Sequence, residues 1–367
     1  MTPLHILFAP VLRTEGWLSI ELQEQNILEA LHTHHPEWPL TRLAPDEAGT
    51  EQPMRRRWRR SITYPRLIRE AAAKTGGRCV LHVSDHSYGH LCRAHTPCVI
   101  NCNDLHHFVE PHLDPVRLWL WRQRVRTMRH AARVLTISAH LAGEVCEHLR
   151  LPPEQVTALP GGIDAEVFHP MSAETTAQLM PQVAALRRDH LLVVNIGTNH
   201  RRKNLPTVLR AVRHLISREK LPVKLLKVGP ALRGGEHEAL IAELGIADHI
   251  IDLGTLKPEQ VAAVCNQAHA LAFASLYEGF GRPTLEAQAC GLPCVLADAS
   301  CMREVGGDGA LYHVPLDHEE LAVQLVRAMT DAEMRRQLVA AGLENVQRFS
   351  WRSYADKLVR VYQEVAA

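Results

Sequence analysis

The chain has 367 residues, of which 46% are hydrophobic and 22% are charged, and its formal net charge at pH 7 is +1. This length predicts two domains, and the near-neutral charge argues against a nucleic-acid partner. No run of about 18 apolar residues is present, so no segment is expected to span a membrane. Nine cysteines without a CxxC pair, and an N-terminus without a basic leader, indicate a cytoplasmic protein with buried thiols.

Short, continuously apolar runs occur in two sets along the chain. The first set covers 5–10, 79–84, 97–102, 133–138 and 155–160, and the second covers 191–197, 223–229, 249–254, 271–275 and 293–298. Such runs are typical of parallel strands covered on both faces. Amphipathic helices are expected between them, for example at 204–218, 258–268 and 318–330. The alternation predicts an α/β fold with two tandem Rossmann-like domains.

The alternation is interrupted once, at 171–190, which we interpret as a linker between the domains. The prediction is therefore an N-terminal domain over 1–170, a C-terminal domain over 191–349 and a final helix over 350–367. Ligands of open α/β sheets bind beyond the carboxyl ends of the strands. The loops that follow the apolar runs are thus the places to search for functional residues.

One such loop, in the sequence "YEGFGRPTLEAQAC", carries two glutamates and leads into a helix. Gly279 and Gly281 allow a ligand to approach the backbone, and the N-terminus of the helix favours an anion such as phosphate. Glu278 and Glu286 would repel phosphate, but a carboxylate can accept hydrogen bonds from neighbouring sugar hydroxyls. From the spacing alone, a capping glutamate and a glutamate on the helix face are an equally good interpretation.

A second loop, after the first strand of the C-terminal domain, contains Arg201, Arg202 and Lys203. Parallel strands would place it at the same edge of the sheet as the Glu278 loop. Arginine and lysine at that edge can neutralise a pyrophosphate. A lone basic triplet is more often a solvated loop, and only the neighbouring glutamate loop favours a binding role.

Together these segments resemble the retaining glycosyltransferases of the GT-B fold, in family 4 (group 1). "IGTNHRRKNL", "EGFGRPTLE" and the late "RFSW" carry the resemblance, and "EGFGRPTLE" matches the family's E-x7-E motif. The resemblance implies two Rossmann-like domains that face each other across a cleft, with the C-terminal helix packing back toward the first domain. It also implies a hexosyltransferase that uses a nucleoside-diphosphate sugar and a glycan or lipid-linked acceptor in surface polysaccharide biosynthesis.

The same resemblance implies that the C-terminal domain binds the donor. Glu278 would contact the transferred sugar, Glu286 the ribose, and Arg202 with Lys203 the diphosphate. The remaining donor contacts would come from Gly197, Leu256, Gly279, Phe280 and Gly281. Because the chain contains no D-x-D triplet, we expect the cations to act in place of a metal, with no metal ion and no cofactor.

The N-terminal domain would bind the acceptor. Gly16 stands where the family usually has a glycine-rich turn that meets the donor phosphate, although a plain strand–helix turn explains it equally well. Asn103 and Asp104 follow a strand, and many relatives have a histidine at the position of Asn103. Asparagine can still bond a sugar hydroxyl, so both residues remain site candidates.

Arginines are concentrated in two segments, Arg55–Arg69 and Arg117–Arg133, and the second also contains Trp119 and Trp121. A basic surface with tryptophans can lie on an anionic membrane, which predicts a peripheral location on its inner face. A solvated helix face paired with local acids is the alternative.

Three other functions are compatible with parts of the sequence. A nucleotide-sugar-binding protein without turnover is suggested by Asn103. A sugar-nucleotide epimerase has the same fold, but the "EGFGRPTLE" stretch argues against it. A nicotinamide dehydrogenase is disfavoured because no G-x-G-x-x-G follows the first strand.

Overall fold

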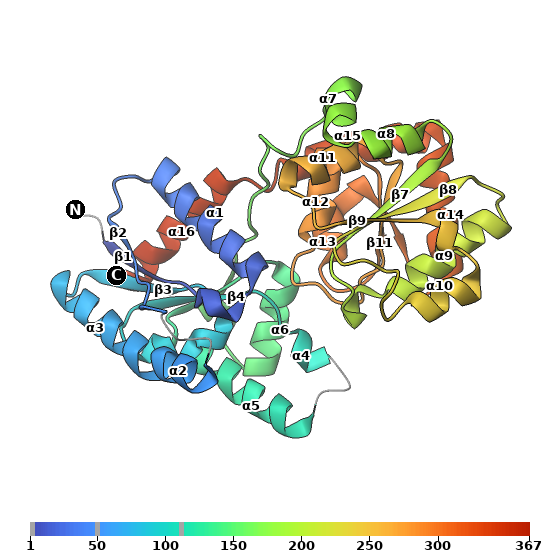
Figure 1. The fold of residues 1–367 in the computed structure, drawn as a ribbon. Coiled ribbons are helices and arrows are strands. Elements are labelled where there is room, and N and C mark those ends of the chain that lie inside the picture. The colour runs from blue at the N-terminus through green and yellow to red at the C-terminus, as the bar shows by residue number, and fades with distance from the viewer. Residues whose placement is uncertain (1–3, 48–51, 110–113) are drawn as a thin grey trace. The chain divides into compact units, whose positions relative to one another are not determined.

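The computed structural model describes residues 4–47, 52–109 and 114–367. The chain divides into two compact units (Figure 1). Unit 1 contains Met1–Gly162 together with Trp351–Ala367, and unit 2 contains Ile163–Ser350. Within the described ranges, none of the helices combines the length and the hydropathy of a membrane span.

Unit 1 is built on a six-stranded parallel sheet with the order β2-β1-β3-β4-β5-β6. Its strands are β1 His5–Ala9, β2 Leu40–Arg42, β3 Cys79–Val83, β4 Cys98–Cys102, β5 Arg133–Thr136 and β6 Val156–Ala158. Its helices are α1 Leu18–His34, α2 Pro53–Trp58, α3 Tyr64–Lys74, α4 His106–Val109, α5 Pro115–Val125, α6 Ala139–Leu149 and α16 Trp351–Ala366. Shorter helical turns are η1 Arg13–Glu15, η2 Arg59–Thr63, η3 His86–Arg93, η4 Arg126–His130 and η5 Pro153–Gln155.

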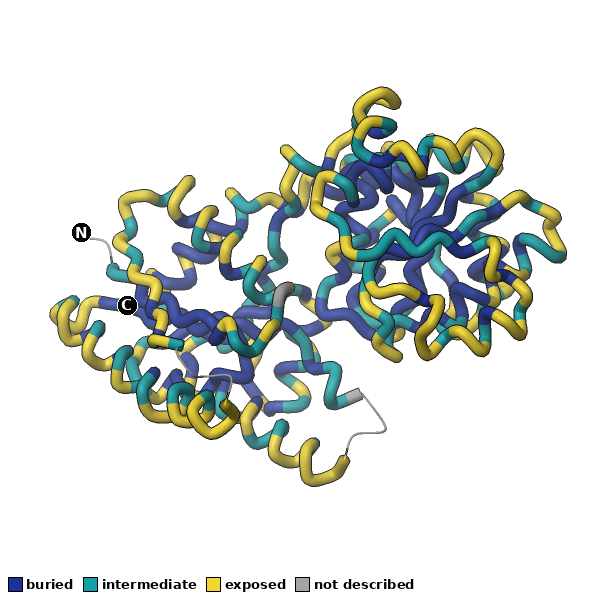
Figure 2. Tube along the Cα trace, viewed as in Figure 1, coloured by how far each residue is buried: buried dark blue, intermediate teal, exposed yellow. Residues whose placement is uncertain are grey.

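Alternate residues of these strands enter two separate cores, one on each face of the sheet. Most residues of the central strands β1, β3 and β4 are buried (Figure 2). In β1, Leu7 packs in one core while Ile6 and Phe8 pack in the other. Both faces are therefore apolar, as expected for a parallel sheet covered by helices on both sides. This is why the strands appear in the sequence as continuous hydrophobic runs.

The last helix, α16, belongs to unit 1, where it packs along α1 and over β3 (Figure 1). Its Tyr362 is fully buried, and the hydroxyl lies 2.5 Å from Nδ1 of His82 in β3. The other ring nitrogen of His82 lies 3.0 Å from Oδ1 of Asn101. The predicted packing of the C-terminal helix toward the first domain is confirmed.

Unit 2 has a second six-stranded parallel sheet, with the order β12-β11-β10-β7-β8-β9. Its strands are β7 Leu191–Ile196, β8 Val223–Val228, β9 Ile250–Gly254, β10 Ala270–Phe273, β11 Cys294–Ala297 and β12 Ala310–His313. Its helices are α7 Ala173–Leu179, α8 Pro181–Arg187, α9 Leu205–Ser217, α10 Glu238–Leu244, α11 Pro258–Gln267, α12 Arg282–Ala289, α13 Met302–Gly306, α14 His318–Thr330 and α15 Ala332–Val346. Shorter turns are η6 Arg201–Lys203, η7 Ala247–His249 and η8 Gly307–Gly309.

The two strands that no apolar run predicted, β2 and β12, lie at sheet edges. Both strands are partly exposed. β2 has a single apolar residue, Leu40, whereas β12 contains a short apolar stretch, 310–312, that was not assigned to a strand. The other ten strands occur where they were expected, within one or two residues.

The expected linker at 171–190 instead contains α7 and α8, which are part of unit 2. Gln267 at the end of α11 donates a hydrogen bond to the carbonyl of Thr176 in α7, and Val183 of α8 is fully buried. The segment looked irregular in the sequence because its two helices are short and separated by Pro181.

All nine cysteines lie within the described ranges; none forms a disulfide, and eight are buried. This agrees with their interpretation as small hydrophobic residues.

Because α16 completes one core of unit 1, its apolar face should be important for stability. Leu358 is fully buried, and Leu358→Ala should lower the free energy of unfolding by about 2–5 kcal/mol, from lost burial and the cavity left behind. Arg360→Ala, on the exposed face of the same helix, should change it by less than about 0.5 kcal/mol. Urea unfolding of both variants measures the difference, and equal effects would show that α16 does not stabilise this unit.

Candidate functional site

Glu278 lies in the loop between β10 and α12, at the carboxyl end of the sheet of unit 2. It is only 7% exposed. Its Oε2 accepts a hydrogen bond from Nη1 of Arg202 at 3.0 Å, and its Oε1 accepts one from Nζ of Lys203. A nearly buried carboxylate with two cationic partners therefore lies at the edge where open α/β sheets bind ligands.

The Glu278 loop and the basic loop η6 are joined by several further hydrogen bonds. The N–H of Leu276 donates to the carbonyl of Arg202 at 2.8 Å, and Nη1 of Arg202 donates to the carbonyl of Tyr277 at 2.9 Å. Asn204, which has a left-handed backbone with φ of 52°, donates to the carbonyl of Ala274 at 3.2 Å. The prediction that these two loops share one edge of the sheet is confirmed, because β7 and β10 are adjacent strands.

The charges in this cluster shift each other's protonation. Burial alone would raise the pKa of Glu278, but Lys203 and Arg202 outweigh it and hold the pKa below its ordinary value. Burial lowers the pKa of Lys203, and the attraction of Glu278 offsets this only in part. Glu278 interacts with two cations, whereas Lys203 interacts with one carboxylate and is also repelled by Arg202. Attraction therefore outweighs the cost of burial for Glu278 but not for Lys203. The cluster carries an excess of positive charge that a bound anion would balance.

A third loop, between β11 and α13, forms hydrogen bonds with the backbone of Glu278, and no sequence motif indicated it. Ser300 accepts a hydrogen bond from the backbone N–H of Glu278 at 3.1 Å, and Sγ of Cys301 donates to its carbonyl at 3.3 Å. Both residues follow β11, the neighbour of β10. Their position after a predicted strand was the available signal, but "ADASC" carries neither the basic triplet nor the glutamate and glycines that drew attention to the other two loops.

The glycine-rich turn before α12 adopts the geometry expected of a close approach to the backbone. Gly281 has φ of +83°, and a Cβ there would come within 2.4 Å of Cε of Met302. Phe280 packs on the core, with its ring 5.6 Å from that of Phe349, and Gly279 is buried. No residue with a side chain fits at Gly281 without displacing Met302.

Glu286 lies in the second turn of α12 and is 7% exposed. Burial raises the pKa of Glu286, and the adjacent Arg282, whose Nε lies 2.9 Å from Oε1, lowers it only partly. It therefore has a different environment from Glu278, whose pKa is lowered.

The remaining predicted donor contacts lie at the ends of neighbouring strands. Gly197 follows β7 with φ of +141°, and a Cβ placed on it would lie 3.6 Å from Cε of Lys203. Leu256 follows β9 and packs partly buried on the core of unit 2. The structure thus brings Gly197, Arg202, Lys203 and Glu278 together, while Glu286 and Leu256 lie farther along their own segments.

In unit 1, Asn103 and Asp104 follow β4 at the carboxyl end of its sheet. Nδ2 of Asn103 donates to Oδ2 of Asp85 at 3.1 Å, and the same oxygen lies 3.3 Å from Nδ1 of His86. Asp104 lies 2.5 Å from Nδ1 of His106. Asn103 is therefore part of a buried polar cluster that includes an Asp85–His86 pair, and Oδ1 of Asn103 is buried without a hydrogen-bond partner among the described residues.

The protonation states of Asp85 and His86 follow from their contact. Burial opposes charge on both side chains, yet Asp85 raises the pKa of His86, and His86 lowers the pKa of Asp85.

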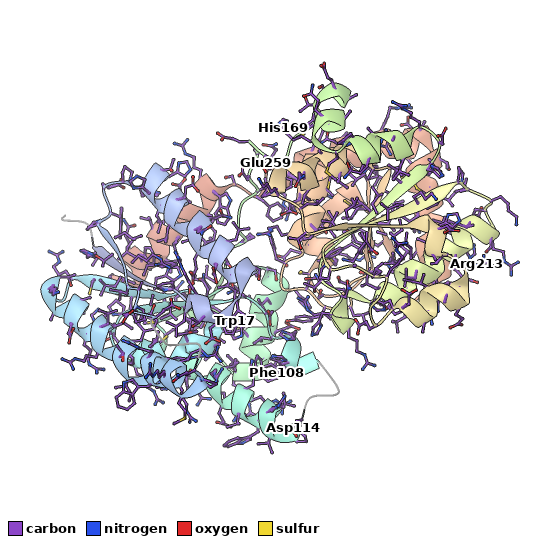
Figure 3. All side chains as sticks on the ribbon, viewed as in Figure 1. Trp17, Phe108, Asp114, His169, Arg213 and Glu259 are labelled. Carbon is purple, nitrogen blue, oxygen red and sulfur yellow. The ribbon has the colours of Figure 1, made fainter. Side chains whose placement is uncertain are left out.

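Aromatic rings pack beside this polar cluster. Trp121 of α5 makes edge contacts with His86, His107 and Phe108, the last of which is labelled in Figure 3.

Gly16 ends the turn η1 after β1, with φ of +70°, and a Cβ on it would meet nothing within 4 Å. The left-handed backbone explains the glycine, so its presence does not by itself indicate a ligand. The neighbouring Glu15 lies 3.3 Å from Nη1 of Arg60 and accepts a hydrogen bond from the hydroxyl of Tyr88 at 3.2 Å.

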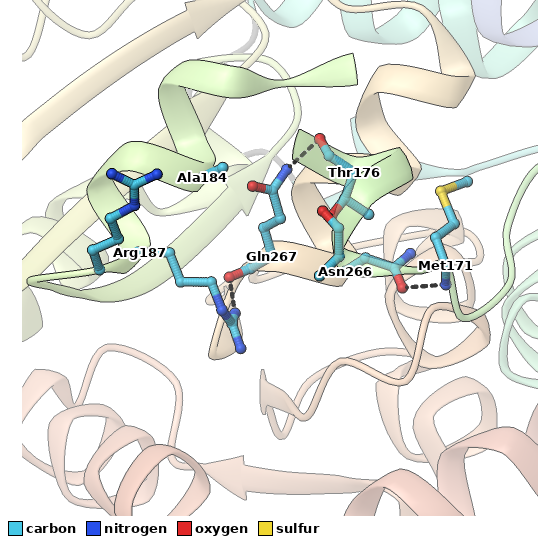
Figure 4. A pocket seen from close by; sticks show the side chains of 8 residues that line it. Met171, Thr176, Ala184, Arg187, Asn266 and Gln267 are labelled. Carbon is cyan, nitrogen blue, oxygen red and sulfur yellow. Dashed lines mark hydrogen bonds between the residues drawn. The ribbon is translucent and has the colours of Figure 1, made fainter. Parts of the chain in front are cut away.

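A cavity of about 430 Å³ lies elsewhere in unit 2, between α7, α8 and the end of α11 (Figure 4). Several of its polar groups form hydrogen bonds that hold these helices together. Nε2 of Gln267 donates to the carbonyl of Thr176, and the N–H of Met171 donates to Oδ1 of Asn266 (Figure 4). This cavity contains none of the residues singled out in the sequence.

Among the side chains that the structure places, no three His, Cys, Asp or Glu residues form a group that could hold a metal ion.

Two sequence models of known families match the chain. The model of "Glycosyl transferases group 1" matches residues 178–363, which is just over half of the chain, and "Glycosyltransferase Family 4" matches residues 21–167. The chain belongs to the group 1 glycosyltransferases. The resemblance carried by the two loops of unit 2 is confirmed.

Named relatives of this group 1 chain include the MMP alpha-(1->4)-mannosyltransferase of Mycolicibacterium hassiacum, which is 33% identical over 69% of the chain. The O-antigen chain mannosyltransferase B of Escherichia coli is 27% identical over 64% of the chain. The matches span only 59% and 61% of the lengths of these two relatives.

Solved structures show the same fold. Sucrose-phosphate synthase from Thermosynechococcus elongatus has a TM-score of 0.78 at 19% identity, with 98% of each chain covered. Anabaena Alr3699/HepE, solved with UDP and glucose, has a TM-score of 0.72 at 18% identity and covers 98% of this chain and 99% of its own. The GT-B fold is thereby established for this chain.

The ion pairs of Glu278 should make a pH-dependent contribution to stability. Glu278→Gln leaves two cations without their carboxylate and should lower the free energy of unfolding at pH 7 by about 3 kcal/mol. Because the folded-state pKa of Glu278 lies below its ordinary value, the contribution is present above pH 4.5 and is lost as the pH falls below it. Urea unfolding at pH 7 and pH 4 should therefore show a smaller difference between the two proteins at pH 4.

The matched control is Asp298→Asn, which removes the carboxylate of an exposed ion pair with Arg303 in the same unit. It should change stability little, because exposed pairs contribute little. A similar loss in both variants, or a Glu278→Gln difference that persists unchanged at pH 4, would contradict the assignment.

Proposed function

We propose that this protein is a retaining glycosyltransferase that moves a hexosyl unit from a nucleoside-diphosphate sugar to a glycan or lipid-linked acceptor in surface polysaccharide biosynthesis. The observation that carries the proposal is the nearly buried Glu278 held by Arg202 and Lys203 at the carboxyl end of the sheet of unit 2. Membership of the group 1 family and the polysaccharide-related names among its relatives support it. One protein of the same fold has been solved with UDP and glucose.

In this proposal, unit 2 binds the donor. Arg202 and Lys203 contact the diphosphate, and the excess positive charge of their cluster balances it. Glu278 positions the hydroxyls of the transferred sugar, and Gly279, Phe280 and Gly281 let the ligand approach the backbone before α12. Glu286 contacts the ribose, and the segment around Leu256 faces the base.

The chemistry follows from how the leaving group is stabilised. Negative charge grows on the leaving phosphate as the glycosidic bond breaks, and fixed cations and helix-end N–H groups lower the energy of that state. The leaving phosphate then accepts the proton of the acceptor hydroxyl on the same face, which retains the anomeric configuration. Glu278 therefore acts by orientation rather than as a nucleophile. We propose that the reaction needs no metal ion, because Arg202 and Lys203 supply the positive charge.

Unit 1 would bind the acceptor. Asn103 and the Asp85–His86 pair provide buried hydrogen-bonding groups at the carboxyl end of its sheet, and the half-buried Asp104 lies beside them. Oδ1 of Asn103, which has no hydrogen-bond partner among the described residues, is suited to accept a bond from a sugar hydroxyl. Gly16 lies on the same sheet edge, after β1.

Two helices of unit 1 carry a surface that suits an anionic membrane. Met54, Trp58 and Ile62 form an exposed apolar stripe at helical spacing on α2 and η2, with Trp58 63% exposed. On α5, Val116, Trp119 and Leu120 are also exposed. Arginines surround both stripes, and the charges of Arg57 and Arg60 act on Arg124. Protruding apolar side chains within a basic surface can insert among anionic headgroups, so we propose peripheral binding to the cytoplasmic side of a membrane.

A thermal-shift screen with UDP, GDP, ADP, dTDP and CMP, each with EDTA, tests the donor site. A ligand at about 100 times its dissociation constant should stabilise the protein by roughly 2.7 kcal/mol. We expect one diphosphate to raise the unfolding temperature, and Lys203→Ala to remove the shift. No shift with any nucleotide would contradict the donor site.

Hydrolysis of the matching nucleotide sugar then separates an enzyme from a protein that only binds it. Slow hydrolysis that depends on Glu278, tested with Glu278→Ala, supports the transferase. Binding without any turnover, in the presence of a range of acceptors, would favour the non-catalytic alternative.

Sedimentation with lipid vesicles at low salt tests the membrane surface. The protein should bind vesicles that contain phosphatidylglycerol and not vesicles of phosphatidylcholine alone. Replacing Trp58 and Trp119 by serine should reduce this binding at least several-fold, because the tryptophans supply the buried apolar area. The control replaces Leu316 and Val323, exposed apolar residues of unit 2, by serine. An equal loss in both double variants would show that the surface is not specific.

A further inference from the structure

Lys227 is a fully buried lysine in the strand β8, and neither the family motifs nor the proposed mechanism uses it. Its Nζ donates hydrogen bonds to the carbonyls of Gly197 and Val228, the second at 3.0 Å. No carboxylate among the described residues lies within ion-pair distance of this Nζ. Burying an ammonium group without an anionic partner is costly, so a lysine at this position calls for an explanation.

The lysine belongs to a row of polar residues across three neighbouring strands. Asn195 of β7 pairs with Lys227, and Lys227 pairs with Asp252 of β9. Paired residues of adjacent strands project from the same face of the sheet, and the row lies near the carboxyl ends of the strands. Asp252 accepts hydrogen bonds from the backbone N–H groups of Leu232 and Arg233. The row therefore bonds to two loops: Lys227 to the loop after β7, and Asp252 to the loop after β8.

The bond to Gly197 brings Lys227 to the base of the basic loop. A Cβ on Gly197 would lie 3.7 Å from Nζ of Lys203, and a Cβ on Gly229 would lie 2.3 Å from the carbonyl oxygen of Gly197 and 3.1 Å from Nζ of Lys227. The ammonium groups of Lys203 and Lys227 thus both lie close to the backbone of Gly197. Only glycine leaves room for this arrangement at 229, where φ is +114°.

We propose that Lys227 is a positioning residue for the diphosphate of the donor, which fixes the carbonyl of Gly197 and adds a buried positive charge beneath the Gly197–Lys203 loop. This role rests on the proposed donor site of unit 2. The charge of Lys203 is shared with Arg202 over one carboxylate, Glu278, whereas Lys227 has no such partner among the residues that the structure describes. A bound diphosphate would supply the negative charge that the site lacks.

The charge of Lys227 depends on pH in the neutral to basic range. Burial lowers the pKa of Lys227 to about 8, with Asp252 opposing and Lys203 adding to the shift. The core on the Lys227 face of the sheet receives apolar side chains from the buried side of α9, among them Leu205, Val208 and Leu209. Below pH 8 the ammonium is charged and favours an anion, and above pH 8 the charge is lost. Affinity for a diphosphate should therefore fall as the pH rises through about 8.

Titration calorimetry with inorganic pyrophosphate between pH 7 and pH 9.5 tests this role. Lys227→Met keeps the unbranched side chain as far as Cε and removes the ammonium group, and should weaken binding at pH 7 by about 10-fold or more. The variant should also lack the part of the pH dependence centred near 8. Arg202 and Lys203 are present in both proteins, so the difference between the two profiles isolates Lys227.

The matched control is Lys224→Met, the same change in the same strand, where Nζ bonds the carbonyl of Asp248 at 2.7 Å. It should bind pyrophosphate like the wild type at every pH. Lys203→Met assigns the binding to this site and should abolish it. If Lys227→Met fails to fold, Lys227→Gln replaces it, since glutamine can still bond the carbonyl of Gly197.

Each outcome is decisive. Wild-type affinity and an unchanged pH profile in the Lys227 variant, with binding lost in Lys203→Met, would overturn the role of Lys227 alone. No binding to the wild type, or binding that Lys203→Met leaves intact, would overturn the donor site and the role of Lys227 together. Weaker binding with a flattened profile in the Lys227 variant only would support the proposed role.

Discussion

The interaction on which the site of unit 2 depends is the sharing of one nearly buried carboxylate, Glu278, by Arg202 and Lys203. Neither loop could hold its charged residue at this depth without the other, because an isolated buried charge is strongly unfavourable. The adjacency of β7 and β10 brings the loops together, and backbone hydrogen bonds fix their distance. The cluster keeps an excess of positive charge, which is the basis of the proposed diphosphate site.

Residues behind the charged loops also hold the backbone of this site by hydrogen bonds. Lys227 supports the carbonyl of Gly197 from the core side, and Ser300 and Cys301 support the backbone of Glu278. These groups hold a charged loop in place by hydrogen bonds to its backbone, which is how catalytic geometry is usually made rigid. The loop residues that carry charge and the buried residues that hold them come from different strands of one sheet.

Unit 1 reaches a comparable result with less charge. Its sheet edge gathers Asp85, His86 and Asn103 into a buried hydrogen-bonded group, and its outer helices expose tryptophan and arginine. The opposite charges of Asp85 and His86 cancel, and hydrogen-bonding groups without a net charge suit hydroxyls, whereas cations such as those of unit 2 suit phosphate. The two units therefore present different chemical groups, although both do so at the carboxyl edge of a parallel sheet.

The sequence by itself determined ten of the twelve described strands, the α/β alternation and the loops of Glu278 and Lys203, because apolar runs and charged loops are local features. It missed β2, which has one apolar residue, and β12, whose short apolar stretch is partly exposed. It also placed a linker where α7 and α8 form part of unit 2. Only the tertiary structure revealed Lys227 beneath Gly197, Ser300 beneath Glu278 and the Asp85–Asn103 bond. Each of these contacts joins different strands, and a residue's neighbour across a sheet is set by strand order, which the local sequence does not encode.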